Sequence, residues 1–294
     1  MTLSILIPTH DFTCYKLVYD LHEQAERLGI DYEIIVAEDG SRYTVSMIAN
    51  LKVENLSNCK YFRQQPALKP AGIRNLLAEK AQGEWIMFID SDAKVDSDDF
   101  LKKYLDNKDK ADVVVGGVKT PDAHLNPEVS LRYRYEKEAD KHRSAEERMK
   151  NPYARFATFN FMVKRSVFMD IKFDKDCKEY GYEDALFGVE LKKRNVSILH
   201  IDNALIHTGL DDNKTFLKKT ETALHTLKGL NGKMKSYSGV EQMYAKLQSL
   251  HMLWAMRLFF WLFSSQIKKN LLGKKPSLFW FSVYKLGYYG KIKN

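Results

Sequence analysis

The sequence predicts an α/β fold, with a mostly parallel β-sheet followed by a helical C-terminal extension. Over the first 115 or so of the 294 residues, short apolar runs alternate with segments of helical periodicity, as in strands joined by crossover helices. The C-terminal extension is set apart by its charge. Residues 251–294 hold eight Lys or Arg and no acid, so the whole net charge of +8 lies there.

Each expected element follows from its residue pattern. Apolar residues recur at helical spacing over residues 17–28 and stop at Gly29, a residue that favours helix ends. The helix over residues 71–81 begins after Pro70, whose fixed backbone suits a first helical turn. Residues 85–89 (WIMFI) are apolar throughout, as in a central strand covered on both faces. The expected strands are residues 3–7, 33–37, 60–63, 85–89, 112–115, 155–164 and 196–201, and the expected helices are residues 17–28, 71–81, 98–105 and 183–194.

The same patterns predict two regions. The main domain covers residues 1–215, and a helical, basic and aromatic region covers residues 216–294. Residues 119–155 form an insertion in the main domain, because prolines bracket them and their charge is high. A single charged helix is expected over residues 128–150.

Composition and missing motifs exclude several classes of protein. Hydrophobic residues make up 45% of the chain and charged residues 29%, which excludes a disordered or fibrous chain. The three cysteines form no CxxC pair, and their odd number argues for a reducing compartment without a disulfide framework. No basic segment precedes the first apolar run, which therefore indicates a strand and not a signal peptide. Motifs of P-loop NTPases, Rossmann dehydrogenases, zincins and α/β-hydrolases are missing.

Two aspartates directly follow the central strand over residues 85–89. Asp90 and Asp92 are two positions apart, so their side chains point the same way on an extended segment. Two carboxylates at one spot repel unless a cation or hydrogen-bond donors neutralise them. Hard oxygen ligands with open positions suit Mg²⁺ or Mn²⁺ held together with substrate phosphates. The alternative is a loop of solvated acids, and the position after a buried strand favours the metal site.

Other candidate residues each have an ordinary alternative. Glu183 and Asp184 open a helix, where acids are favoured by the macrodipole, yet neighbouring aromatics suit a general base with a raised pKa. Asp39 fits a simple turn with the glycine after it. Arg74 is either a solvated helix residue or a phosphate contact. His207 is favoured as a satisfied histidine over a metal ligand.

Four strings in order resemble the family 2 glycosyltransferases of the GT-A fold: SILIPTHDF, EIIVAEDGS, AGIRNLLAEKAQGEWIMFIDSD and GYEDALFGVELKKR. They span roughly residues 3–210, about two thirds of the chain. The resemblance implies a GT-A catalytic domain over residues 1–215. It also implies an inverting, metal-dependent transferase of the hexosyltransferase type, which moves a sugar from a nucleotide-sugar, a UDP-sugar being favoured, to an acceptor hydroxyl.

The resemblance also implies a donor site. Pro8 and Thr9 are expected to line the nucleoside pocket, and Asp39 to read the base. Arg74 is expected near the diphosphate. Asp90 is expected to approach the ribose or the metal.

The metal and the catalytic base are implied in the same way. Asp92, with Asp90, would hold Mn²⁺ or Mg²⁺, and His207 matches a position where some members supply a further ligand. Asp184 would deprotonate the acceptor, with Glu183 beside it. This agrees with the chemistry, since a divalent ion stabilises the leaving diphosphate and one carboxylate takes the proton.

The acceptor is expected to be a saccharide or a lipid-linked saccharide in the assembly of a surface polysaccharide or glycolipid. Residues 158–161 (TFNF) fall where members often have small residues that shape the acceptor site, but Phe159 and Phe161 are bulkier. The charged helix over residues 128–150 is favoured as a solvated helix over a part of the acceptor site.

The basic tail predicts a membrane contact. Residues 252–263 are apolar except for Arg257, a run too short to span a bilayer. On a helix, Arg257, Ser264 and Lys268 share one side, which leaves a wide apolar face. Residues 251–294 are therefore expected to bind an anionic membrane surface, although packing on the catalytic body is the alternative. The expected location is cytoplasmic, peripheral on the inner face of the membrane.

Two other functions remain open at this point. A sugar-nucleotide nucleotidyltransferase shares the sheet and the metal chemistry, but it should have a Gly-rich loop after the first strand, and PTHDFTCYK has no glycine. A non-catalytic protein that binds a membrane or nucleic acid is the second alternative. The intact acidic pairs argue against it, and no nucleic-acid partner is expected, because that reading leaves the acidic residues unexplained.

Overall fold

The computed structural model describes residues 1–122, 130–174, 180–235 and 237–292. The chain divides into two compact units, which we treat separately. The sheet unit comprises Met1–Pro121, His142–Lys178 and Glu183–Gly209, and the helical unit comprises Asp122–Lys141, Glu179–Tyr182 and Leu210–Asn294.

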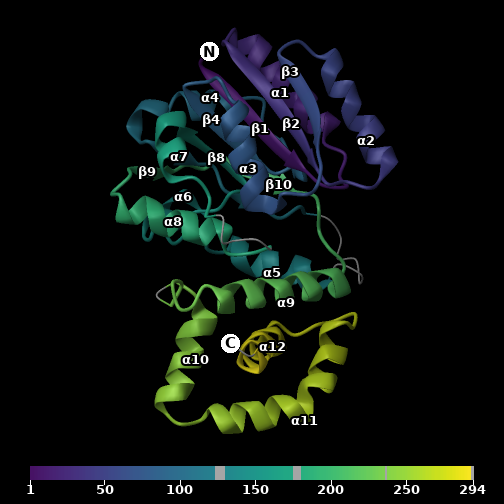
Figure 1. Ribbon diagram of the computed structural model, residues 1–294, viewed down its shortest axis with the longest axis vertical. Coiled ribbons are helices and arrows are strands. Elements are labelled where there is room, and N and C mark those ends of the chain that lie inside the picture. Colours follow the sequence, from purple (N-terminus) through teal and green to yellow (C-terminus); the bar gives the residue numbers. More distant parts are fainter. Residues whose placement is uncertain (123–129, 175–179, 236, 293–294) are drawn as a thin grey trace. The chain divides into compact units, whose positions relative to one another are not determined.

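The sheet unit is built on a seven-stranded sheet with the order β3-β2-β1-β4-β8-β6-β9 (Figure 1). β1 to β4 run parallel, whereas β8 runs antiparallel to its neighbours β4 and β6. The expected mostly parallel α/β sheet is therefore confirmed. Its strands are β1 (Leu3–Thr9), β2 (Tyr32–Asp39), β3 (Cys59–Gln64), β4 (Trp85–Ile89), β6 (Val113–Val115), β8 (Asn160–Lys164) and β9 (Ile198–His200).

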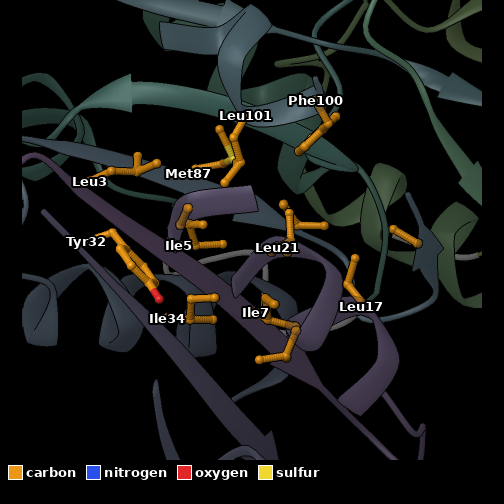
Figure 2. Close-up of a cluster of buried hydrophobic side chains, with 14 of the residues drawn as sticks. Leu3, Ile5, Ile7, Leu17, Leu21, Tyr32, Ile34, Met87, Phe100 and Leu101 are labelled. Atoms are coloured by element: carbon orange, nitrogen blue, oxygen red, sulfur yellow. The ribbon is translucent and has the colours of Figure 1, made fainter. Parts of the chain in front are cut away.

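The core of the sheet unit lies where α1 packs against the central strands. All five residues of β4 are buried, as expected for a strand covered on both faces. Figure 2 shows side chains of β1, β2 and β4 meeting those of α1 and α4 in one apolar cluster. The helices of this unit are α1 (Tyr15–Leu28), α2 (Thr44–Leu51), α3 (Lys69–Lys80), α4 (Phe100–Leu105), α6 (Ala145–Met149), α7 (Arg165–Ile171) and α8 (Glu183–Lys193), with 3-10 turns at Lys52–Asn55 and Lys108–Lys110.

A small second sheet lies beyond the end of β4. It has the order β5-β10-β7, formed by β5 (Ala93–Lys94), β10 (Leu205–His207) and β7 (Val118–Lys119). β5 and β10 are antiparallel, and Ala93 pairs with His207. This pairing brings a late segment of the chain to the residues that directly follow the central strand.

Two expected elements differ from the structure. The strand expected over residues 155–164 is only β8 (Asn160–Lys164), because turns precede it, with the amide of Arg155 donating to the carbonyl of Asn151. Of the single helix expected over residues 128–150, the described part forms α5 (Ser130–Asp140) and α6. Ser144 caps α6 by accepting from the amide of Glu147, so a new helix starts there.

The helical unit contains α5, α9 (Asn213–Gly229), α10 (Gly239–Ser249), α11 (Leu253–Leu271) and α12 (Leu278–Lys291). Figure 1 shows α9, α10 and α11 around α12, and α12 contacts each of them. Aromatic and aliphatic side chains from α5, α9, α11 and α12 form its core. The expected helical C-terminal extension is confirmed. In the described part of the chain, no helix has the length and apolar character needed to cross a bilayer.

Candidate functional site

The sequence-predicted site residues all lie in the sheet unit. β1, β2 and β4 are parallel, with Thr9 beside Glu38 in the register. Their carboxyl ends therefore meet at one edge of the sheet, where ligands bind in folds of this kind. Pro8, Thr9 and Asp39 lie at the ends of β1 and β2, and Asp90 directly follows β4.

Asp39 is the buried last residue of β2. Its Oδ1 accepts from the amide of Leu68 at 2.6 Å and its Oδ2 from the amide of Lys69 at 2.9 Å. Burial raises the pKa of Asp39, and the two amide bonds work against that rise. Each carboxylate oxygen has a second lone pair. Asp39 is therefore held rigidly and keeps acceptor capacity at the sheet edge, so it is more than the turn residue of the simpler interpretation.

The loop after β1 is tied to the loop after β2. The Thr9 hydroxyl donates to the carbonyl of Phe12 at 3.0 Å, which fixes the turn of the first loop. Asp11 Oδ1 accepts from the amides of Arg42 and Tyr43 at 2.6 and 2.8 Å. Asp11 is not among the site residues predicted from the sequence. Its backbone φ of 52° is the local signal of a special turn, and that signal is visible only in the structure.

Arg74 on α3 is buried, with only 5% of its surface exposed. Its Nη2 donates to Asp90 Oδ1 at 2.5 Å, and its Nη1 lies 3.8 Å from Glu183 Oε1 and donates to the carbonyl of Pro70 at 3.3 Å. The interpretation of Arg74 as a solvated helix residue is therefore wrong. Among the described residues, its buried Nε has no hydrogen-bond partner, a cost that it shares with Arg132 and Arg165.

Three carboxylates surround this one guanidinium, and we call Asp90, Glu183 and Asp184 with Arg74 the carboxylate cluster. Burial raises the pKa of Asp90 to about 6; Arg74 opposes the rise, and Asp92 adds to it. Burial, with the neighbouring Glu183, raises the pKa of Asp184 to about 7. One cation does not neutralise three carboxylates, so the cluster favours protons or a further cation.

Glu183 and Asp184 occupy the first turn of α8, as expected. Asp184 Oδ1 accepts from the amide of Ala185 at 2.7 Å. A carboxyl group whose pKa lies near neutrality can accept a proton in one step and release it in the next. This part of the site therefore has the chemistry of a general base.

Asp92 and His207 form a second pair. The distance from His207 Nε2 to Asp92 Oδ2 is 3.1 Å, and the His207 ring packs edge-on against Phe159 at 5.4 Å between centroids. Thr208 donates to the carbonyl of Asp92 through its amide at 2.8 Å and its hydroxyl at 2.6 Å. A Cβ on Gly209 would lie 2.3 Å from Asp92 Oδ2, so this position requires glycine. Neither Thr208 nor Gly209 is among the site residues predicted from the sequence.

Asp92 and His207 fit a divalent cation better than the full predicted ligand set does. Within the described residues, no group of three or more His, Cys, Asp or Glu is arranged to hold a metal ion. Asp90 is bonded to Arg74 instead. Two ligand atoms on adjacent positions of an octahedral ion, each about 2.1 Å from it, are about 3 Å apart. The 3.1 Å between Asp92 Oδ2 and His207 Nε2 equals that distance, and it is equally the length of the direct hydrogen bond that joins them here.

The two phenylalanines of residues 158–161 have different places. Phe161 on β8 is fully buried and stacks on Phe88 at 5.1 Å, within a group that includes Phe156 and Phe187. Its ring therefore belongs to the core behind the site. Phe159 supports the His207 ring.

Comparisons with known proteins identify the family and the fold. The model of the family "Glycosyl transferase family 2" matches residues 4–172, more than half of the chain. An "Uncharacterized glycosyltransferase" of Haemophilus influenzae is 30% identical over 104 residues, which cover 34% of this chain and 40% of that protein.

Solved structures share the fold. Residues 1–349 of S. aureus TarS in complex with UDP-GlcNAc match with a TM-score of 0.52 and 17% identity, over 98% of this chain and 90% of that one. The mannosyltransferase PcManGT of Pyrobaculum calidifontis, in complex with GDP-Man and Mn²⁺, matches with a TM-score of 0.55 and 12% identity, over 98% of this chain and 84% of that one. The GT-A-like fold expected from the sequence is thereby confirmed.

Proposed function

We propose that this chain, which belongs to glycosyl transferase family 2, moves a sugar from a UDP-sugar to an acceptor hydroxyl with inversion at the anomeric carbon. The observation that carries this proposal is the carboxylate cluster beside the Asp92–His207 pair. It offers a carboxyl group with a pKa near neutrality next to two ligand atoms that suit one divalent cation. One proton acceptor and one site for a cation are what this reaction needs.

Asp184 is the proposed base. The acceptor oxygen forms a bond to the anomeric carbon, its proton passes to the Asp184 carboxylate, and the bond from that carbon to the diphosphate breaks. The electron pair of the broken bond leaves with the nucleoside diphosphate. Glu183 keeps the pKa of Asp184 high through its negative charge, so Asp184 holds a proton well enough to take it from a hydroxyl.

Asp92 and His207 are the proposed holders of Mn²⁺ or Mg²⁺, with Asp90 close by. When bound, the divalent ion would stabilise the negative charge that develops on the leaving diphosphate. Thr208 and Gly209 position Asp92, the first through two hydrogen bonds and the second by leaving room for its carboxylate. Among the structural relatives, PcManGT contains Mn²⁺.

The donor site is proposed at the ends of β1 and β2. Pro8 and Thr9 would line the nucleoside pocket, and Asp39 would accept from the base through its remaining lone pairs. Arg74 is buried and bonded within the cluster, so we assign it to positioning Asp90 and Glu183 near the diphosphate. The relatives bind different nucleotides, UDP-GlcNAc in TarS and GDP-Man in PcManGT.

The proposed acceptor is a saccharide or a lipid-linked saccharide, in the assembly of a surface polysaccharide or glycolipid. The basic charge of residues 251–294 supports an acceptor at an anionic membrane. The proposed location is cytoplasmic, peripheral on the inner face of the membrane.

The test is calorimetric titration of UDP, GDP and CDP with Mn²⁺, with Mg²⁺ and with a chelator. We expect one nucleotide to bind, and its affinity to fall at least tenfold on chelation or in Asp92→Asn. Asp96→Asn is the matched control, because Asp96 lies just beyond β5 and pairs with Lys119 instead of with a residue of the cluster. Folded protein that binds no nucleotide under any of these conditions would contradict the proposal.

A further inference from the structure

Helix α11 carries apolar side chains on two opposite faces. Phe260, Ile267 and Leu271 are buried and belong to the core of the helical unit. These positions recur every seven and four residues, which is the spacing of a single helix face. One apolar face is therefore already used for packing, and no core requirement explains apolar residues on the other side.

The opposite side forms what we call the outer apolar face, made of Trp254, Leu258, Trp261 and Leu262. The two tryptophans are 70% and 76% exposed, and the two leucines 49% and 56%. Their spacing of four, three and one residues is again that of one helix face. Contiguous exposed apolar side chains of this size mark interaction surfaces in proteins.

The apolar surface continues beside this face into a groove of about 370 Å³. The groove is lined by Phe259, Phe263, Gln266, Ile267, Asn270 and Trp280. Four of these six side chains are apolar, and Phe259 and Phe263 are themselves exposed. A groove with an apolar lining and a few amides suits a chain of methylene groups.

The charged residues near the outer apolar face indicate what kind of partner this face binds. Arg257, Lys268 and Lys269 are exposed on α11, and Lys274 and Lys275 are exposed in the segment that follows. Within the described residues, Lys268 is the only one of these that forms an ion pair, 3.3 Å from Glu221. No acid occurs from residue 251 to residue 294. Basic side chains beside exposed tryptophan and leucine match an anionic lipid surface, where indole rings lie at the level of the headgroups.

We propose that the outer apolar face inserts into an anionic bilayer surface, with α11 in the plane of the interface and an acyl chain in the groove beside it. Trp254 and Trp261 lie at the boundary between headgroups and acyl chains, and the lysines contact lipid phosphates. This rests on the membrane location proposed above, and it is independent of the sugar transfer, because it is argued from the helical unit and not from the donor site. It narrows the membrane contact from the whole basic tail to four named side chains and their neighbouring groove.

The test is flotation of the full chain with vesicles of phosphatidylcholine alone, or with 30% phosphatidylglycerol. We expect binding to the mixed vesicles, little binding to the neutral ones, and weakening at high salt. Trp254→Ser with Trp261→Ser should reduce the affinity at least tenfold. Val45→Ser is the matched control, because Val45 is 81% exposed on α2 of the sheet unit and should leave vesicle binding unchanged.

Two further measurements keep the outcomes distinct. Nucleotide binding by the double variant should equal that of the parent chain, which shows that folding and the donor site are intact. Light scattering reports whether the same face instead joins two copies of this chain. Unchanged vesicle binding in the double variant, equal loss in Val45→Ser, or a dimer that the double variant separates without any vesicle binding would each overturn the proposal.

Discussion

Two buried arginines of the sheet unit, Arg74 and Arg148, have the same exposure of 5% and opposite surroundings. Arg148 on α6 donates only to neutral acceptors: the carbonyls of Val115, Gly116, Ile201 and Arg143, and Nδ1 of His200. Arg74 faces carboxylates at Asp90 and Glu183 and leaves its Nε unpaired within the described residues.

The partners of the two arginines show how a purely structural environment differs from that of a candidate site. A guanidinium whose donors are all used by neutral acceptors holds strand ends and turns together. Its partners carry no charge that a ligand or a proton would have to balance. A guanidinium inside an excess of carboxylates leaves a net negative charge that protons or cations can balance. Burial alone therefore does not separate the two arginines, whereas the charge of their partners does.

The largest expected effect concerns Asp184, the proposed proton acceptor of the carboxylate cluster. Asp184→Asn should lower kcat for sugar transfer by on the order of 10³-fold, as expected on loss of a general base, and leave the nucleotide affinity within about twofold. In the parent chain, kcat/KM should rise with pH through about 7, because the carboxylate is the active form. Steady-state rates from pH 5.5 to 8.5 measure both effects.

A rate loss below tenfold, or a pH limb that persists unchanged in Asp184→Asn, would assign the proton transfer to another group. Asp202→Asn serves as the control, since Asp202 is exposed to solvent at the cap of α6, where its Oδ1 accepts from the amide of Ala145.

The second prediction compares the arginines directly. Arg148→Met should lower the free energy of unfolding by about 3 kcal/mol, since a buried cation that bonds several acceptors is lost. The loss should change little between pH 6.5 and pH 8, because burial lowers the pKa of its partner His200 to about 4. Arg74→Met removes the cation that opposes the raised pKa values of the buried carboxyls. Because folded carboxyls with raised pKa values bind more protons than unfolded ones, its destabilisation should grow as pH rises.

Urea unfolding of both variants at the two pH values measures this difference. If the losses of unfolding free energy in Arg74→Met and Arg148→Met change equally with pH, the two arginines do not differ in the charge of their surroundings as described.

The smallest expected effect concerns two glycines. A Cβ on Gly209 would meet Asp92 Oδ2 at 2.3 Å, and a Cβ on Gly117 would meet Arg148 Nη2 at 2.9 Å. Gly209→Ala should weaken Mn²⁺-dependent nucleotide binding about tenfold, or about 1.4 kcal/mol, because the Asp92 carboxylate must move. Asp92 Cβ would lie 2.7 Å from the added Cβ, so some stability should be lost as well. Gly117→Ala should lower stability and spare nucleotide binding, as its φ of +96° also disfavours a side chain. Calorimetry measures nucleotide binding by both variants, and thermal unfolding measures their stability. Normal nucleotide binding by Gly209→Ala together with weakened binding by Gly117→Ala would contradict the assignment of Asp92 to the cation.

The strands were predictable because their signal is local. The apolar runs of β1, β2 and β4 are each found within two residues of their observed bounds, and the acids that follow them were found with them. What the sequence did not reveal depends on distant partners. Arg148 was placed in a charged, solvated helix, although it is buried against carbonyls of residues 115, 116 and 201. The spacing of residues along the chain does not indicate contacts between positions so far apart in the sequence.

The Asp92–His207 contact joins residues that are 115 positions apart. His207 is the last residue of β10, a strand of three residues in a small sheet. The central strands, in contrast, are fixed by the buried cluster of Figure 2. β10 is the middle strand of its small sheet, but each of its two pairings joins only two residue pairs. A strand held by so few pairings opens locally at a lower free energy than a core does. Detachment of β10 would therefore abolish the site while β1, β2 and β4 stay paired. Inactivation on gentle heating should then precede melting of the sheet.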